Sequence, residues 1–223
     1  MILVEGGTFK MGSLTDSSGQ GAISVHANYQ VSLSGFSIGK YEVTQAEWTA
    51  VMGVNLSQHQ GCGDCPVEDV SFNDIQLFLQ SLNKMTGRHY LLPTSAQWEF
   101  AARGGNKTKG YKYAGSDDID EVAWYGGEFI DSTHRVGRKH PNELGICDMS
   151  GNVEEWCSDF FDPNGPFRQG AETNPYGPST GAGHTIRGGS WGAHPTQCGV
   201  LGSHIGYPND RNAHVGFRLV LAP

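Results

Sequence analysis

The sequence predicts an α+β domain that is rich in loops and has few helices. Three observations support this prediction. The chain of 223 residues contains 32 glycines and 10 prolines, which favours turns and short elements. Three segments carry the capping signals of helices. Several other segments show the short alternation of apolar and polar residues that is typical of strands.

Each predicted helix begins at a Ser or Thr side chain that has a polar partner three residues later. Such a pair satisfies backbone amides that the first helical turn leaves without partners. The pairs are Thr44 with Glu47, Ser71 with Asp74, and Thr94 with Gln97. Glycines end the three helices, at Gly53, at Gly87 and at Gly104-Gly105. In the second helix, apolar residues recur at helical spacing and predict a core-facing side: Ile75, Phe78, Leu79, Leu82 and Met85.

Six further segments are predicted as short strands because of their apolar alternation or brief apolar runs. They are residues 2–5, 8–11, 29–33, 36–41, 186–191 and 215–223. In the last segment, the alternation from Val215 to Leu221 predicts one face on the core, with Arg218 on the other face. The chain contains no internal repeat and no low-complexity linker, so we predict a single domain over residues 1–223.

Composition excludes some partners. The formal net charge is -8 and the 15 Lys and Arg residues are spread thinly, so the surface is not suited to binding nucleic-acid phosphates. The apolar start, residues 1–4, is followed by Glu5 and is too short for a secretion signal or a membrane span. We therefore expect any export signal to lie upstream of Met1, outside this chain.

The five cysteines are odd in number and do not form a disulfide framework. Cys62 and Cys65 have the spacing of a zinc-binding or redox-active pair. Zinc would need a second pair, and a redox pair would need a thioredoxin-like βαβ context, neither of which is evident. A surface-loop disulfide or two unreactive thiols is the favoured interpretation.

The segment from Gly192 to His214 differs from the rest of the chain. It reads GAHPTQCGVLGSHIGYPNDRNAH, contains no Lys, Glu, Met or Trp, and has no steady helical or strand period. Patterned strands flank it on both sides. An irregular, chemically mixed stretch between ordered strands is where binding function is often found.

Seven motifs, in order along the chain, resemble those of the formylglycine-generating-enzyme-like (sulfatase-modifying factor) domain. They are GGTFKMGS, YEVTQAEW, PVEDVSFNDI, LPTSAQWEFAARGG, NELGICDMSGNVEEW, RGGSW and GFRLVLAP. The resemblance covers nearly the whole chain and implies a C-type lectin-like fold with paired N- and C-terminal strands. Because one fold can host many functions, the activity has to be argued from the site.

The same resemblance offers an enzymatic alternative, a formylglycine-generating or related copper- or iron-dependent oxidase. The active oxidases bind copper through two cysteines after the RGGSW motif, and these positions correspond to Ala193 and Cys198. A copper(I) site of this kind needs both thiolates. We therefore expect no copper, no catalytic residues, and a framework role for Cys198.

A second branch with this fold, the variable proteins of diversity-generating retroelements, is more similar. These proteins carry a hypervariable stretch before a GFRL-type final strand, the position of residues 192–214 here. Randomisation of adenines in AAC codons keeps the final C and so excludes Lys, Glu, Gln, Met and Trp. Every residue of the segment except Gln197 belongs to the allowed set. The resemblance thus implies a non-enzymatic, ligand-binding variable protein.

Many substitutions can be tolerated only where side chains face solvent and other residues fix the backbone. Within this segment we assign five residues to that fixed framework: Pro195, Cys198, Val200, Pro208 and Arg211. The candidate ligand contacts are Gly192, Ala193, His194, Thr196, Gln197, Gly199, Leu201, Gly202, Ser203, His204, Ile205, Gly206, Tyr207, Asn209, Asp210, Asn212, Ala213 and His214. The expected anchors are Tyr207, Leu201, Ile205 and the three histidines. A plain loop without a ligand is the alternative. A zinc site from the histidines is disfavoured, because their even spacing matches no regular element.

The resemblance also implies a structural calcium site. In the enzymes the matching loop holds calcium through two side chains and two carbonyls, which correspond to Asp148, Glu155 and the carbonyls of Gly151 and Val153. Hard oxygen ligands of this kind suit calcium. A loop held by hydrogen bonds alone is the alternative. The second calcium site of the enzymes falls near Val122-Ala123, where apolar residues stand, and we expect it to be missing.

The resemblance carries expectations about location and partners. We expect a monomer on the extracellular face of a bacterial surface, attached as a lipoprotein through an anchor outside this chain. The expected ligand is an unidentified protein or glycan on other cells, a host or phage. No nucleic-acid partner is expected. Within the scaffold, Trp191 and Phe217 are expected to be buried beside the variable segment.

Overall fold

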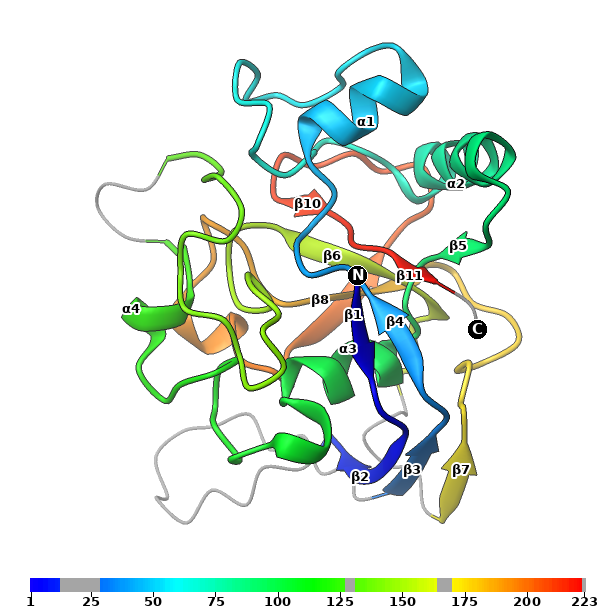
Figure 1. Cartoon of the computed structure of the whole chain (residues 1–223), viewed down its shortest axis with the longest axis vertical. Helices are drawn as coiled ribbons and strands as arrows, with labels where there is room; N and C mark the ends of the chain where they lie inside the picture. Colours follow the sequence, from blue (N-terminus) through cyan, green and yellow to red (C-terminus); the bar gives the residue numbers. More distant parts are fainter. Residues whose placement is uncertain (13–28, 127–130, 164–169, 222–223) are drawn as a thin grey trace.

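The computed structural model describes residues 1–12, 29–126, 131–163 and 170–221 (Figure 1). Its helices are α1 (Gln45–Met52), α2 (Phe72–Thr86), α3 (Ser95–Ala102), α4 (Ile119–Val122) and the short 3-10 helices η1 (Gly105–Lys107) and η3 (Pro195–Gln197). Its strands are β1 (Ile2–Val4), β2 (Gly7–Met11), β3 (Tyr29–Leu33), β4 (Phe36–Ile38), β5 (Tyr90–Leu91), β6 (Glu154–Phe160), β7 (Ala171–Thr173), β8 (His184–Arg187), β9 (Ser203–Gly206), β10 (Val215–Gly216) and β11 (Val220–Leu221). The predicted α+β class is confirmed.

The first sheet joins the two ends of the chain. Its strand order is β1-β4-β11-β5, and all its pairs are antiparallel. Ile38 of β4 lies opposite Ile2 on one side and Val220 on the other. The terminal strands therefore share a sheet, but β4 separates them. The direct pairing that the resemblance implied is corrected in this detail.

The second sheet carries the segment that the sequence singles out. Its order is β10-β6-β8-β9; β8 is antiparallel to both β6 and β9, and β10 is parallel to β6. The third sheet, β2-β3-β7, lies at the opposite end of the molecule from α1 and α2 (Figure 1).

All three predicted helices form with the predicted caps. Thr44, Ser71 and Thr94 each accept a hydrogen bond from the backbone N–H of their partner, and each partner's side chain accepts one back from the cap. Gly53 and Gly87 end α1 and α2 in left-handed conformation, whereas α3 ends at Ala102 and is capped by Arg103, one residue before the predicted glycine pair. No pattern in the sequence predicted α4, because a helix of one turn has no period.

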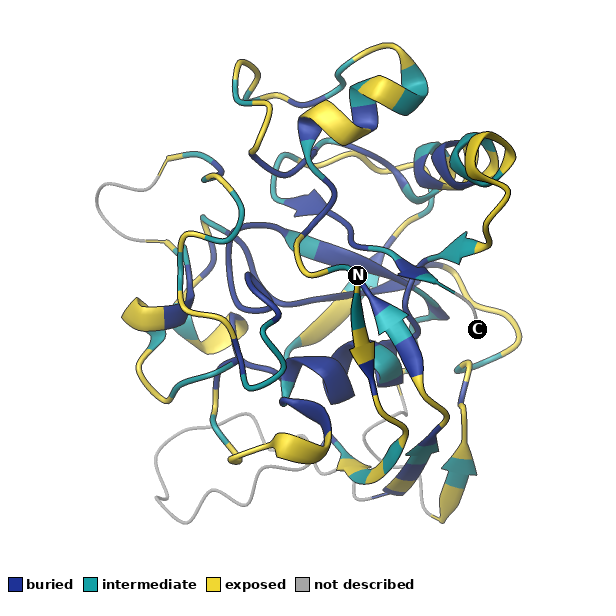
Figure 2. Ribbon diagram, viewed as in Figure 1, coloured by how far each residue is buried: buried dark blue, intermediate teal, exposed yellow. Residues whose placement is uncertain are grey.

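Three apolar clusters fill the interior of the described part of the chain, and Figure 2 shows buried residues concentrated on the central strands and on α3. In one of them, Trp48 stacks on Phe78 at 5.1 Å between ring centroids, and Phe217 meets both rings edge-on. Phe217 is fully buried, as the sequence predicts. Trp191 is only half-buried, so that part of the prediction is wrong.

Several predicted strands end early. Residues 36–41 form a strand only as far as Ile38, and residues 186–191 only as far as Arg187, because Gly188 and Gly189 follow with φ of 101° and 70°. The last segment divides into β10 and β11. Arg218, predicted to lie on the face away from the core, is fully buried between them. No helix in the described part of the chain has the length and apolar character needed to cross a membrane.

Candidate ligand-binding surface

The two ends of the segment 192–214 are held together by backbone hydrogen bonds. The N–H of Trp191 donates to the carbonyl of Asn152 at 2.8 Å, and the N–H of Glu154 donates to the carbonyl of His214 at 2.8 Å. The indole Nε1 of Trp191 donates directly across the gap to the carbonyl of Ala213 at 3.1 Å. The segment therefore leaves and re-enters the scaffold at one place, beside the start of β6.

The first part of the segment is pinned by its own side chains. His194 caps η3, and its backbone N–H donates to Oε1 of Gln197 at 3.0 Å. The sequence treated this stretch as irregular, and the short helix is a correction. This cap also gives Gln197 a structural role at an exposed position. Gln197 is the one residue of the segment that an AAC-derived codon cannot encode.

The middle of the segment is strand β9, at the edge of the second sheet, where the sequence predicted no strand. Its register pairs Ser203 with Arg187 and Gly206 with His184. Ser203 and His204 are exposed, but Gly206 is buried. A Cβ added at Gly206 would overlap the Ile186 side chain and the Trp156 ring. Gly206 is therefore scaffold, and its assignment as a ligand contact is wrong.

The last part of the segment lies against the start of α2. The N–H of Asn73 donates to the carbonyl of Pro208 at 3.2 Å, and its side-chain amide donates to Oδ1 of Asn209 at 2.7 Å. Arg211 makes two hydrogen bonds to the carboxylate of Asp74, at 2.8 and 2.9 Å. Asp74 also closes the cap of α2, so Arg211 fixes the segment to a helix terminus. Its assignment to the framework is consistent with these contacts.

Burial divides the candidate contact positions. Ala193, Gly199 and Gly206 are buried, which corrects their assignment as contacts. The partly buried ones are Leu201, Gly202, Ile205, Ala213 and His214. The exposed ones are Gly192, His194, Thr196, Gln197, Ser203, His204, Tyr207, Asn209, Asp210 and Asn212. Tyr207, the expected aromatic anchor, is 52% exposed. Most positions chosen from the sequence therefore do face solvent.

Leu201 is a poor anchor. It packs against the apolar core and lines a cavity of about 90 Å³ together with Ser203, Thr185 and the buried carboxyl of Asp159. Its side chain therefore serves the scaffold more than the outer surface.

A group of three rings lies beside the segment, and the sequence missed one of them, His59. His59 meets Trp191 edge-on with ring centroids 5.3 Å apart, and Trp191 stacks on His214 at 4.2 Å. His214 also lies 3.3 Å from the hydroxyl of Ser190 through Nδ1. His59 comes from a loop far away in the sequence, and no local pattern points to it.

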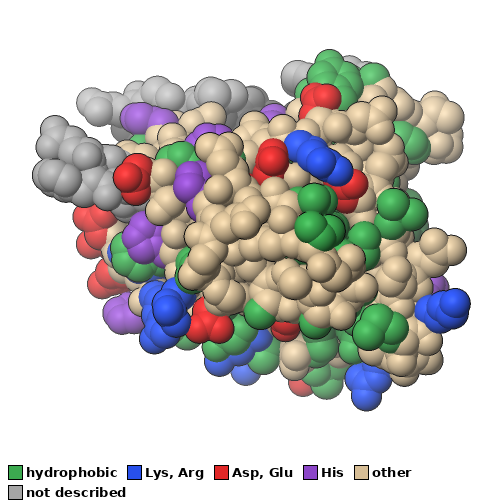
Figure 3. All heavy atoms as spheres, turned by 90° about the horizontal axis from the view of Figure 1, so that it is seen from above, with side chains coloured by type: hydrophobic (Ala, Val, Ile, Leu, Met, Phe, Trp, Pro, Cys, Tyr) green, Lys and Arg blue, Asp and Glu red, His purple; other side chains and the backbone are tan. Residues whose placement is uncertain are grey.

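Two histidines of the segment have shifted pKa values. The hydrogen bond that Nε2 of His204 donates to the carboxylate of Glu154, at 3.0 Å, raises the pKa of His204, whereas burial lowers the pKa of His214. Seen from above, histidines gather on one side of the molecule, while Lys and Arg are few and scattered (Figure 3). This face is thus rich in imidazole and poor in Lys and Arg side chains.

The cysteine left after the RGGSW motif does not suit copper chemistry. Cys198 is fully buried, and burial raises the pKa of its thiol to about 12. Ala193, at the position of the second cysteine, is buried and has no donor atom. A two-thiolate copper site does not fit these residues.

The calcium loop fits a cation in part. Asp148 is buried; one carboxylate oxygen accepts from the N–H of Gly137 at 2.6 Å, and the other, Oδ1, has no hydrogen-bond partner among the residues that the structure describes. Burial raises the pKa of this carboxyl to about 6. Glu155, in contrast, is held by Arg218 through both oxygens at 2.6 Å. The unpartnered oxygen of Asp148 favours a bound cation. Arg218 already neutralises Glu155, which leaves this carboxylate less need of calcium. The calcium site stays a prediction.

The described residues contain no group of three or more His, Cys, Asp or Glu side chains placed to hold a metal ion. The three histidines of the segment have separate partners: His194 caps η3, His204 pairs with Glu154, and His214 stacks on Trp191.

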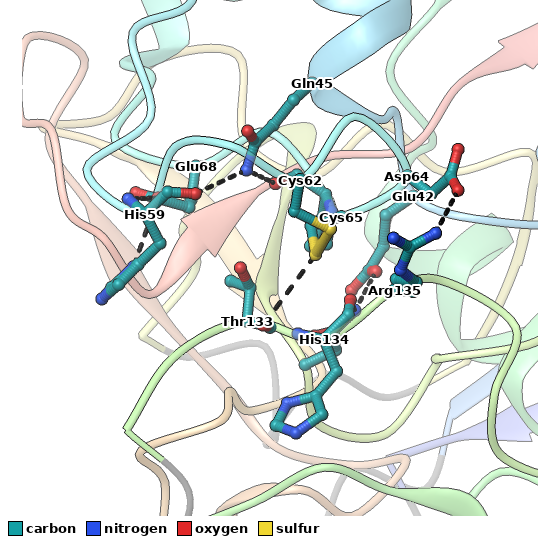
Figure 4. The surroundings of a disulfide bond; sticks show 12 residues. Glu42, Gln45, His59, Cys62, Asp64, Cys65, Glu68, Thr133, His134 and Arg135 are labelled. Atoms are coloured by element: carbon teal, nitrogen blue, oxygen red, sulfur yellow. Dashed lines mark hydrogen bonds and ion pairs between the residues drawn. A yellow bond between two sulfur atoms is a disulfide. The ribbon is translucent and has the colours of Figure 1, made fainter.

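Cys62 and Cys65 form a disulfide, as the favoured interpretation of the sequence expected (Figure 4). The loop that it closes contacts the first turn of α1: the carbonyls of Gly63 and Cys65 accept from the N–H groups of Ala46 and Gln45. The buried Cys147, Cys157 and Cys198 are free thiols.

Comparisons with known proteins agree with this structure. The chaperone protein LppX of Paenibacillus barcinonensis is 36% identical over 207 residues, covering 70% of each chain. The formylglycine-generating enzyme of Streptomyces coelicolor is 33% identical over 193 residues, covering 79% of this chain and only 58% of the enzyme. Among solved structures, Treponema denticola variable protein 1 has a TM-score of 0.89 at 28% identity, covering 100% of this chain and 95% of that one.

These similarities confirm the resemblance and the C-type lectin-like fold of the formylglycine-generating-enzyme type. A family model, described as the sulfatase-modifying factor enzyme 1-like domain, matches residues 1–223. The chain belongs to the family of the sulfatase-modifying factor enzyme 1-like domain.

Proposed function

We propose that this protein is a non-catalytic, ligand-binding variable protein whose segment 192–214 is diversified by a retroelement. The observation that carries the proposal is the division of this segment. Cys198, Val200 and Gly206 are buried in the scaffold, whereas residues such as Thr196 and Tyr207 are exposed between them. Fixed backbone with free side chains is the arrangement that tolerates diversity. The whole-chain similarity to Treponema denticola variable protein 1 supports it.

The alternative is an oxidase of the formylglycine-generating type, favoured by the similarity to the Streptomyces enzyme. The site argues against it. A reactive thiol needs thiolate character and access, and Cys198 has neither, because it is fully buried with its pKa raised to about 12. Oxidation of a cysteine-containing peptide in the presence of copper and oxygen would support the oxidase instead.

For partners, we propose a protein or glycan on another cell, a host or phage, met by a monomer on the outer face of a bacterial surface. A binder of changing specificity is useful where targets change. The net charge of -8 and the scattered Lys and Arg residues make nucleic acid a poor ligand. Lipoprotein anchoring through a segment outside this chain, and calcium at Asp148, belong to the same proposal.

A display experiment tests the proposal. Randomising His194, Thr196, Ser203, Tyr207 and Asn209 should yield binders to lysozyme and to ubiquitin, because these positions are exposed on one segment that is held by β8 and by the start of α2. The matched control randomises five exposed positions elsewhere: Gln76, Gln80, Lys84, Asn106 and Lys107. Equal yields from the two libraries, or none from the first, would contradict the proposal.

A further inference from the structure

We propose that His59 and Trp191 form a constant wall of the binding surface, and that the Cys62–Cys65 disulfide holds this wall in place. This inference rests on the proposed function and extends it to residues outside the variable segment. It also names the kind of partner, a folded protein.

The wall touches the segment through ring contacts. Trp191 stacks on His214, the last residue of the segment, at 4.2 Å and 28° between planes. His59 meets the Trp191 ring edge-on, at 5.3 Å between ring centroids and 84° between planes. The His59 side chain is 25% exposed and Trp191 is half-buried, so both present ring surface to solvent. Rings fixed in this way lose little conformational entropy on binding, which makes them effective anchors.

The backbone of His59 is fixed on both sides. Its N–H donates to Oε1 of Glu68 at 2.7 Å, and its carbonyl accepts from the side-chain amide of Gln45 at 2.9 Å (Figure 4). Glu68 is fully buried, and its own N–H donates to the hydroxyl of Ser57. Gln45 is the first residue of α1, with 2% of its surface exposed. His59 is therefore held by buried polar groups from both ends of its loop.

The disulfide lies between His59 and Glu68 in the chain and fixes the return path. Its loop contacts α1 through the carbonyls of Gly63 and Cys65, at 3.0 and 2.9 Å from the helix amides. On the far side, the carbonyl of Asp64 accepts from the N–H of Val136 at 3.0 Å, and its carboxylate pairs with Arg135 at 2.8 Å. A disulfide that closes this loop limits the conformations that the loop can adopt. The loop therefore stays against α1 and keeps Glu68 aligned with His59.

The arrangement fits a protein partner. The exposed groups lie on separate elements: η3, β9, the stretch near α2, and the His59 loop. A ligand that touches several of them must be broad, and protein interfaces cover about 800 Å² on each side. Protein interfaces are also enriched in aromatic residues such as Trp191.

The test uses the lysozyme and ubiquitin binders of different segment sequence described above. His59→Ala should weaken binding about tenfold in binders to both probes, because a constant wall serves every variable sequence. The matched control is His89→Ala, an exposed histidine at the far end of α2, which should leave Kd unchanged. If the binders keep their affinity with His59→Ala, the wall is refuted while the proposed function stands. If no binders arise, both are refuted.

The disulfide is tested in the same binders by the double change Cys62→Ser and Cys65→Ser. We expect a similar loss of affinity, with faster hydrogen exchange at the amides of Gln45, Ala46 and Val136. If the double variant does not fold, mild reduction of the folded binder with a phosphine gives the same readouts. Unchanged affinity and unchanged exchange would remove the disulfide from the proposal.

Discussion

One buried arginine joins distant parts of this fold. The guanidinium of Arg218 donates to both oxygens of Glu155 and to the carbonyls of Gly39, Cys147 and Asp148. It is fully buried, and so is Glu155. A buried charge is tolerated only when it is paired and hydrogen-bonded, which is the case here.

Removing this arginine should be costly. Arg218→Met leaves the Glu155 carboxylate buried without its partner, so the free energy of unfolding should fall by about 3–5 kcal/mol. Arg211→Met is the matched control. Its bidentate pair with Asp74 is 46% exposed on the arginine side, so the loss should be about 1 kcal/mol or less. Urea unfolding measures both, and equal losses would contradict this account of Arg218.

A second residue-level prediction concerns pH. Burial raises the pKa of Asp159 from 3.8 to about 6. A carboxyl with a raised folded-state pKa contributes stability that is present below pH 3.8 and lost as pH rises through about 6. Asp159→Asn should remove this part of the pH dependence. The free energy of unfolding of the variant should therefore rise relative to that of the wild type as the pH increases from 4 to 7. Parallel stability curves for the two proteins would show that the pKa is not raised.

At the scale of elements, the edge strand β9 shows how variable positions are interleaved with scaffold. Ser203 and His204 are exposed, whereas Gly206, paired with His184 of β8, is buried. Gly206→Ala should lower the unfolding free energy by about 1–3 kcal/mol, since its Cβ would overlap Ile186 and Trp156. Gly199→Ala, whose Cβ would meet only a carbonyl at 3.5 Å, is the control and should change stability by less than about 0.5 kcal/mol. Thermal melts distinguish the two.

Local signals in the sequence predicted some elements and not others. The three long helices follow from Ser71 and its equivalents, because a cap is a short-range interaction that the sequence displays directly. Strand β9 escaped prediction because glycine and polar residues occupy it, and its pairing with β8 is a tertiary contact. Arg218 was placed on the wrong face for the same reason: its partner Glu155 lies 63 residues away.

The candidate binding surface, too, was predicted only in part. Exposure of Tyr207 and the buried framework at Cys198 and Val200 agree with the pattern read from the sequence. The wall residue His59 could not be found, because only the folded chain brings it to Trp191. A histidine that precedes a closely spaced cysteine pair carries no local signal of a binding surface.

At the scale of the whole molecule, calcium links the Asp148 loop to global stability. If the unpartnered Oδ1 of Asp148 binds calcium, the ion stabilises only the folded state, and chelation should lower the melting temperature. Asp148→Ala should abolish this sensitivity. Melts with chelator and with added calcium measure it, and identical wild-type curves would exclude the site.

The central claim is that residues 192–214 are a diversified surface on a constant scaffold. The most direct measurement is deep sequencing of the gene across many cells of the population that carries it. We predict that amino-acid changes concentrate at exposed positions such as Thr196, Ser203, Tyr207 and Asn209, and that buried Cys198, Val200 and Gly206 stay constant. Changes spread evenly over the chain, or falling as often on the buried positions as on the exposed ones, would contradict the account.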